Sequence, residues 1–293
     1  MSPLIISLFF AIISPFIWGF MNLIDKFIIS HRVKNVQSFA FIAAFINFLS
    51  GIVLALFLSW NYNLKDLFPS LISGIIMGTQ FYIYYLIVEK EDSSNYVSLI
   101  YSYPLVVGLL SYFFLNEKLP LIAYFGMILI ILGITLLSLK SNKLKIKIFS
   151  WMMLYMIIST AVYEFFIKMS TNNLPELNGL AITIGICGLV ALPLALNKKI
   201  RKGISKEFKH IPWALFSEAL TFLGILTTYY AMTGLPATIV SSIAAIQPLA
   251  VLFMEKVFHF FNIKIAVNPS IRKRLLPISL IVLGVILLYA FGL

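Results

Sequence analysis

Residues 84–110, YYLIVEKEDSSNYVSLIYSYPLVVGLL, recur in altered form as residues 228–253, TYYAMTGLPATIVSSIAAIQPLAVLF. At an offset of 144 residues, aromatic, polar and proline positions superpose: Tyr85 on Tyr229, Ser98 on Ser242, and Tyr103-Pro104-Leu105 on Gln247-Pro248-Leu249. Further along, GITLL at 133–137 matches GVILL at 284–288, now at an offset of 151. The chain is therefore an internal duplication with a short insertion in its second copy.

The composition indicates a membrane protein, with 61% hydrophobic residues, 11% charged residues and a mean hydropathy of +0.99. A helix needs about 20 apolar residues to cross the hydrocarbon core. Ten runs of about this length are present: 4–29, 36–59, 67–88, 93–115, 119–139, 148–168, 175–196, 211–233, 236–258 and 274–292.

Ten runs divide into five for each copy of the repeat, and an odd number of spans forces the second copy to insert upside down. We therefore predict an all-α integral membrane protein with ten transmembrane helices, built as two inverted five-helix repeats over residues 3–145 and 148–293. Inverted repeats are the common architecture of secondary transporters, so transport is the first hypothesis for function.

Basic residues are distributed unequally between the two sides of the predicted membrane. The net charge is +11, and 19 of the 22 Lys and Arg residues lie at the ends of the odd-numbered runs. Only Lys65, Lys118 and Lys168 belong to the other side. Because Lys and Arg are retained in the cytoplasm during insertion, both termini are predicted to lie outside a cytoplasmic membrane. This pattern argues against nucleic acid as the partner.

Three basic segments, at 140–147, 198–210 and 271–274, contribute most of this charge. They are interpreted either as solvated loops or as docking sites for anionic lipids.

The sequence contains no signature of metal, cofactor or catalytic chemistry. Cys187 is a single cysteine inside an apolar run, and His31, His210 and His259 have no second ligand at metal spacing. Phosphate loops, nucleophile elbows and zinc-protease helices are also missing from the sequence. We therefore expect no cofactor, no metal site and no enzymatic activity.

The end of the first half carries the most informative local motif. Pro104-Leu105-Val106 is followed by Phe113-Phe114-Leu115-Asn116-Glu117-Lys118-Leu119, and Gly126 opens a run that continues as LILGITLL. These residues resemble the proline, F-L-x-E-x-L and G-x-x-L-x-x-x-G pattern of the EamA-type permeases in the drug/metabolite transporter superfamily. The resemblance covers essentially the whole chain. The second half departs from it, because Phe261 stands where a second glutamate is expected.

The resemblance implies an alternating-access carrier whose central cavity lies near the membrane midplane, lined by helices one, three, four, six, eight and nine. Its substrate would be a small organic solute or metabolite, such as an amino acid, and export is favoured. It also implies cytoplasmic termini, which the basic residues contradict; we follow the basic residues. The alternatives are a membrane enzyme acting on lipid and a non-transporting membrane subunit.

Two acidic residues lie inside apolar runs and are candidates for proton coupling. Glu164 has Lys168 four residues later, so it forms either a helical ion pair or a proton or substrate-amine site. Glu218 has no basic residue within one helical turn. An unpaired carboxyl group in a membrane helix is costly and points toward a cavity or a partner.

The remaining candidates for the cavity are polar or aromatic residues in mid-helix. Trp18 lies deep in the first run, whereas Trp60, Trp151 and Trp213 lie near helix ends. Any one of these candidates is otherwise interpreted as packing or interhelical hydrogen bonding. The predicted substrate-contacting residues are Trp18, Asn22, Gln80, Tyr84, Tyr101, Tyr163, Thr227, Tyr230, Ser241 and Gln247.

Helix shape and association have weaker signals. Pro104 and Pro248 are expected to kink the equivalent helices four and nine. Gly74 and Gly78 have GxxxG spacing, which allows close helix approach within the chain or between two chains. We expect a monomer or a weak homodimer surrounded by lipid.

Overall fold

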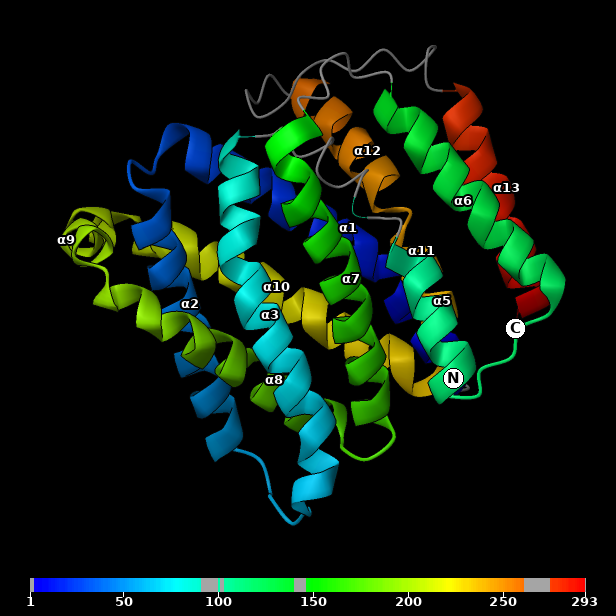
Figure 1. Ribbon diagram of the computed structural model, residues 1–293, viewed down its shortest axis with the longest axis horizontal. Helices are drawn as coiled ribbons and strands as arrows, with labels where there is room; N and C mark the ends of the chain where they lie inside the picture. Colours follow the sequence, from blue (N-terminus) through cyan, green and yellow to red (C-terminus); the bar gives the residue numbers. More distant parts are fainter. Residues whose placement is uncertain (1–2, 91–99, 101–102, 140–145, 261–274, 293) are drawn as a thin grey trace.

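The computed structural model describes residues 3–90, 100, 103–139, 146–260 and 275–292, and this part of the chain forms helices joined by turns, without a strand (Figure 1). The predicted all-α membrane fold is confirmed. The first half contains α1 (Pro3–His31), α2 (Val36–Leu56), α3 (Leu64–Lys90), α5 (Tyr103–Phe114) and α6 (Leu121–Leu139). The second half contains α7 (Ile146–Thr171), α8 (Glu176–Ala191), η1 (Leu192–Leu196), α9 (Lys198–Glu207), η2 (Phe208–His210), α10 (Ile211–Gly234), α11 (Ala237–Ala244), α12 (Gln247–Phe260) and α13 (Leu275–Gly292).

Each of the ten predicted apolar runs overlaps at least one of these helices. Within the described residues, seven helices are long and apolar enough to cross a membrane by length and composition. Large apolar side chains such as Phe57, Phe113 and Leu121 are exposed on the outside of the bundle. Such a surface is unfavourable in water and natural in lipid.

The segment 198–210 is helical, whereas the sequence was interpreted as a loop here. Asn197 caps α9 by accepting a hydrogen bond from the backbone of Lys199, and the basic side chains of α9 alternate with the buried Ile200 and Gly203. Ser38 of α2 donates to the carbonyl of Ile200 at 2.8 Å, so α9 is held against the start of α2. A short amphipathic helix therefore covers one end of the bundle.

Helix contacts in one half have counterparts in the other half. α1 packs against α10, and their counterparts in the other half, α7 and α3, also pack against each other. α2 packs against its own counterpart α8, and α6 packs against its own counterpart α13. In Figure 1, α6 and α13 lie side by side at one edge of the bundle. Equivalent surfaces that pair with each other are the mark of a twofold axis.

Glycine contacts show the direction of that axis. Gly133 of α6 faces Pro277 and Ile281, and the equivalent Gly284 of α13 faces Gly126 and Ile130. As residue numbers increase along α6, the numbers of the residues contacted on α13 decrease, so these equivalent helices run antiparallel. An axis that relates antiparallel equivalent helices lies perpendicular to them, as an inverted repeat requires. The boundary at residues 145–148 remains a prediction.

The same arrangement explains why small residues are needed between α2, α3 and α8. Gly51 of α2 abuts the backbone of Gly185, and Gly188 abuts the backbone of Phe48. Gly74 and Gly78 of α3 face Ile186 and Val190 of α8 across the GxxxG stripe. The GxxxG spacing is thus used for packing within the chain.

The glutamate of the F-L-x-E-x-L segment joins the two halves. The Glu117 carboxylate accepts hydrogen bonds from the backbone nitrogens of Ala237 at 3.0 Å and Thr238 at 3.4 Å. These are the first two residues of α11, so Glu117 satisfies unpaired N–H groups at the start of a helix in the opposite half. Phe261, where a second such glutamate was considered, lies outside the described residues.

Candidate functional site

A central cavity of about 160 Å³ lies between the halves. By the same measure one water molecule needs roughly 10–15 Å³, so the cavity has room for a small organic molecule or several waters. Its walls come from α1, α3, α5, α7, α10, α11 and α12, together with Ile100. These elements correspond to the predicted helices one, three, four, six, eight and nine.

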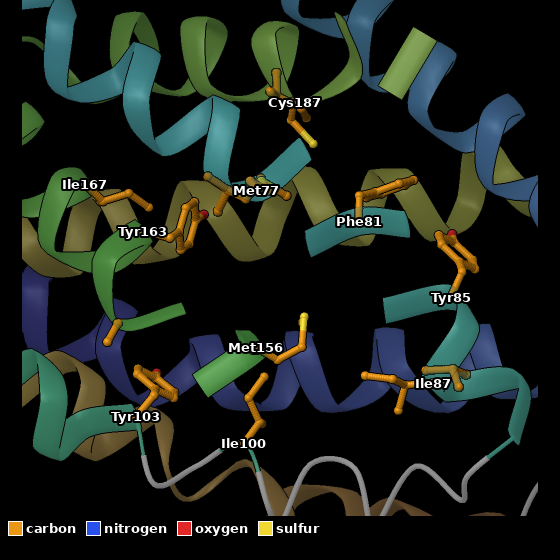
Figure 2. Packing of buried hydrophobic residues seen from close by; sticks show 14 of the residues in the cluster. Met77, Phe81, Tyr85, Ile87, Ile100, Tyr103, Met156, Tyr163, Ile167 and Cys187 are labelled. Carbon is orange, nitrogen blue, oxygen red and sulfur yellow. The ribbon is translucent and has the colours of Figure 1, made fainter. Parts of the chain in front are cut away.

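Most of the predicted site residues that the structure describes line this cavity. They are Trp18, Asn22, Gln80, Tyr84, Tyr163, Glu164, Glu218 and Gln247. Tyr101 lies outside the described residues. Figure 2 shows other lining side chains, among them Met77, Phe81, Tyr103 and Met156, within the buried apolar cluster.

Three predicted residues do not line the cavity. Thr227 donates to the carbonyl of Gly224 at 2.8 Å, and Ser241 donates to the carbonyl of Thr238 at 3.1 Å. Tyr230 stacks on Phe10, with ring centroids 4.9 Å apart. Thr228 and Val240, one residue away, line the cavity instead. Adjacent residues of a helix point about 100° apart, so an error of one position selects a different face.

The structure adds Asp25, an acid that the sequence predictions overlooked. Its side chain is 1% exposed and accepts hydrogen bonds from the hydroxyls of Ser217 and Tyr84, the latter at 2.8 Å. Tyr84 also lies 2.8 Å from the amide oxygen of Asn22. The available signal was the spacing of Asn22 and Asp25, since residues three apart share a helix face.

Glu218 lies beside this group. One of its carboxyl oxygens accepts from the Tyr85 hydroxyl at 3.4 Å, and the other has no hydrogen-bond partner among the described residues. Asp25 is close enough to interact with Glu218 electrostatically. The neighbouring Asn47 amide is fully buried and likewise has no partner of good geometry in the described chain. Two buried acids at this end of the cavity need a proton, a cation or water to compensate their charge.

Glu164 occupies a separate position on α7. One carboxyl oxygen accepts from the Tyr103 hydroxyl at 2.7 Å, while the other is unpartnered within the described part of the chain. Lys168 instead donates to the carbonyls of Met232 at 2.6 Å and Leu235 at 2.8 Å. The helical ion pair between Glu164 and Lys168 is therefore wrong, which leaves Glu164 available to the cavity.

Trp18 and Gln80 both line the cavity and contact neighbouring helices. A Cβ atom on Gly224 would lie 2.7 Å from the Trp18 ring, so the indole lies flat against the glycine surface of α10. The Gln80 amide donates to Ser159 at 2.8 Å and Thr160 at 3.0 Å on α7. Both side chains hold neighbouring helices together while forming part of the wall.

Pro248 lies at a break between two helices beside the cavity. α11 ends at Ala244 and α12 begins at Gln247, so Pro248 occupies the second position of a new helix where a kink was expected. Pro104 has the same position in α5. Because proline lacks an N–H group, the carbonyls of Ile100 and Ala244 lose their usual helical donor four residues later. Both residues line the cavity, as discontinuous helices do at transporter sites.

Metal binding has no visible basis in the described residues, where no three His, Cys, Asp or Glu side chains lie together as ligands. The Cys187 thiol is buried within the apolar cluster.

Comparison with known proteins identifies the fold. A sequence profile of the EamA-like transporter family matches residues 5–139 and 147–290. A solved structure, titled only as the crystal structure of a protein, is similar over 98% of this chain and 96% of its own, with a TM-score of 0.65 and 16% identity. At that identity the likeness concerns the fold alone. A search among curated proteins finds no significant match.

Proposed function

The chain belongs to the EamA-like transporter family, whose members are membrane transporters of small solutes, and on this premise we propose that it carries a small organic solute through the central cavity by alternating access. The observation that supports this most is the cavity itself, which lies between antiparallel halves at the point where the ninth span is broken. A twofold-related pair of halves has two equivalent ways to tilt around one site, which is the basis of alternating access in inverted repeats.

In this proposal the solute contacts Trp18, Asn22, Gln80, Tyr84, Tyr163 and Gln247, with Tyr103 and Thr228 added by the structure. Glu218, with Asp25 beside it, takes up and releases the proton that drives the cycle. Export from the cytoplasm is the proposed direction, with an amino-acid-like metabolite as the first class to test.

The test of this function is transport by the purified full-length chain in sealed liposomes. A panel of amino acids, amines, carboxylic acids and sugars is screened with and without an imposed pH gradient. We expect saturable movement of at least one class, and stronger accumulation with a gradient. Liposomes that contain folded protein and move no member of the panel would contradict the proposed function.

Orientation gives a separate prediction. The proposal places α9 in the cytoplasm and the turn between α2 and α3 outside, because basic residues gather at the α9 end. In a Cys187→Ala background, Asn61→Cys should react with an impermeant maleimide in intact cells. Ser205→Cys should react only after permeabilisation; both positions are exposed, so accessibility alone does not separate them. The opposite labelling pattern would show that both termini lie in the cytoplasm.

A further inference from the structure

The charge of the central cavity is opposite to that of the chain as a whole. The chain carries a net charge of +11, yet the cavity wall contains Asp25, Glu164 and Glu218. Among the described residues that line it, none is Lys, Arg or His. The basic residues that follow Asp25 and Glu164 within one helical turn donate to backbone carbonyls: Lys26 to Val88, and Lys168 to Met232 and Leu235.

From this arrangement we propose that the transported solute is an extended organic cation, a linear diamine or polyamine with an ammonium group toward each end of the cavity. The inference rests on the proposed function and names the substrate class for the same site. Buried carboxylates lose the solvation of water, and a bound cation compensates for it. An anionic solute would add like charge to three acids, so it is disfavoured at this site.

The three acids form two separate poles. Asp25 and Glu218 make one pole, since Ser217 bonds to Asp25 and is adjacent to Glu218 in the chain. Glu164 makes the other. On α10, Glu218 lies eleven positions before Tyr229, whose phenol is close enough to interact electrostatically with Tyr163, the residue before Glu164. At about 1.5 Å per residue, this separates the poles by roughly 16 Å along the helix.

A second route through different helices gives a similar separation. Gln80 of α3 bonds to Ser159 of α7, which places these two residues at one level. Tyr85, the hydrogen-bond partner of Glu218, lies five residues after Gln80 on α3. Glu164 lies five residues after Ser159 on α7. α3 and α7 run antiparallel in Figure 1, so the steps add to about 15 Å at 1.5 Å per residue.

Each pole offers an acceptor to an ammonium group. Oε2 of Glu164 and Oε2 of Glu218 form no hydrogen bond of good geometry with the described residues, although Asn47 and Thr221 lie near the Glu218 carboxyl group and both acids are more than nine-tenths buried. Carboxylate acceptors form strong, short hydrogen bonds with ammonium donors. A monoamine would satisfy one pole, whereas a diamine of sufficient length satisfies both.

The wall between the poles suits an alkyl chain. It contains the aromatic rings of Trp18 and Phe81 and the thioethers of Met21, Met77 and Met156. Methylene groups pack against such side chains, and aromatic faces also attract an ammonium group passing over them. The site thus combines acidic ends with an apolar middle. This pattern is complementary to a linear diamine, which has an ammonium group at each end of an alkyl chain.

The test measures binding and transport of probes that differ only in charge and length. Putrescine, cadaverine and spermidine are compared with pentylamine, and with glutarate, which has the same carbon number as cadaverine. Binding is followed by the thermal shift of the full-length protein in detergent, and transport by counterflow in liposomes. We expect spermidine, the only one of these amines long enough to reach both poles, to bind more tightly than pentylamine by about tenfold or more, the factor for one charge-assisted hydrogen bond. Putrescine and cadaverine reach one pole only and should gain much less over pentylamine. Glutarate should not bind.

Variants at the two poles distinguish this site from general attraction of cations. Glu164→Gln and Glu218→Gln should each reduce the preference for spermidine over pentylamine to near one. Glu218→Asp, which keeps the charge, should retain most of it even if Glu218→Gln folds poorly. Glu255→Gln is the matched control, because this acid on α12 does not line the cavity, and it should leave the preference unchanged.

The outcomes separate the two proposals. If neutral or anionic solutes are transported and the amines neither bind nor compete, the inference of an organic cation is overturned while the proposed function stands. If folded protein transports no solute but binds the longer amines with the expected preference, the proposed function fails and the ligand assignment stands. Equal binding of pentylamine and spermidine would overturn the two-pole site.

Discussion

Glu218→Gln is expected to abolish accumulation driven by a pH gradient while leaving solute exchange at equilibrium. Glu218 is 3% exposed and lines the cavity, and its Oε2 forms no hydrogen bond of good geometry within the described chain. The titratable groups that face it are Asp25 from α1, Tyr85 from α3 and Cys187 from α8, and none of them is cationic. Its other polar neighbours, Asn47 and Thr221, are uncharged. Its charge must therefore be compensated by a proton or by the solute.

The physical reason for separate effects is that glutamine has the size of glutamate and can still accept from Tyr85 through its amide oxygen, but it cannot release a proton. Without that proton, the protein can still reorient with solute bound, so exchange persists. Net movement no longer consumes the gradient, so accumulation above equilibrium should fall to the level found without a gradient. Because Asp25 remains in the same pole, we expect affinity for the solute to decline without being lost.

The measurement compares counterflow with gradient-driven uptake in the same liposomes. Glu255→Gln serves as the control for removing an acid elsewhere and should behave as the unsubstituted protein. Glu164→Gln should retain dependence on the gradient, since Glu164 lies at the opposite pole. Full gradient-driven accumulation by the Glu218→Gln protein would refute proton coupling at this residue, and facilitated diffusion would then be the better mechanism.

Gly188→Ala is expected to destabilise the protein strongly, whereas Gly185→Ala on the same helix is expected to be tolerated. A Cβ atom on Gly188 would lie 2.7 Å from the Cα of Phe48 and still closer to two other backbone atoms of α2. Backbone atoms in a packed helix cannot move aside as a flexible side chain does. The same atom on Gly185 would meet Gly51 at 3.5 Å, an ordinary contact.

We expect Gly188→Ala to cost about 2–3 kcal/mol or more by overpacking, which corresponds to a fall of roughly 5–10 °C in the melting temperature. Gly185→Ala should change it by no more than about 2 °C, because alanine favours the helix while filling little space. Thermal unfolding followed by size-exclusion chromatography in detergent provides both values. Equal melting temperatures for the two variants would show that α2 and α8 do not approach as described.

Features that repeat along the chain were readable from the sequence. The ten apolar runs, the internal duplication and the resemblance carried by Pro104 and Glu117 predicted a helical membrane transporter with a central cavity, and the EamA-like fold agrees. Eight of the predicted site residues line that cavity, because a polar side chain in a membrane helix has few favourable directions other than the protein interior.

What the sequence determined is therefore the membrane class, the positions of the helices and the inventory of polar groups inside them. Only the tertiary structure decided which partners those groups have: Asp25 joins Ser217 from a helix 192 positions away, and Lys168 turns from Glu164 to the carbonyls of α10 and the residue that follows it. Hydrophobic runs mark where a helix crosses the membrane, but they carry little information about its rotation. Rotation is set by close packing at sites such as Gly188 against Phe48, and it determines which acids face the cavity.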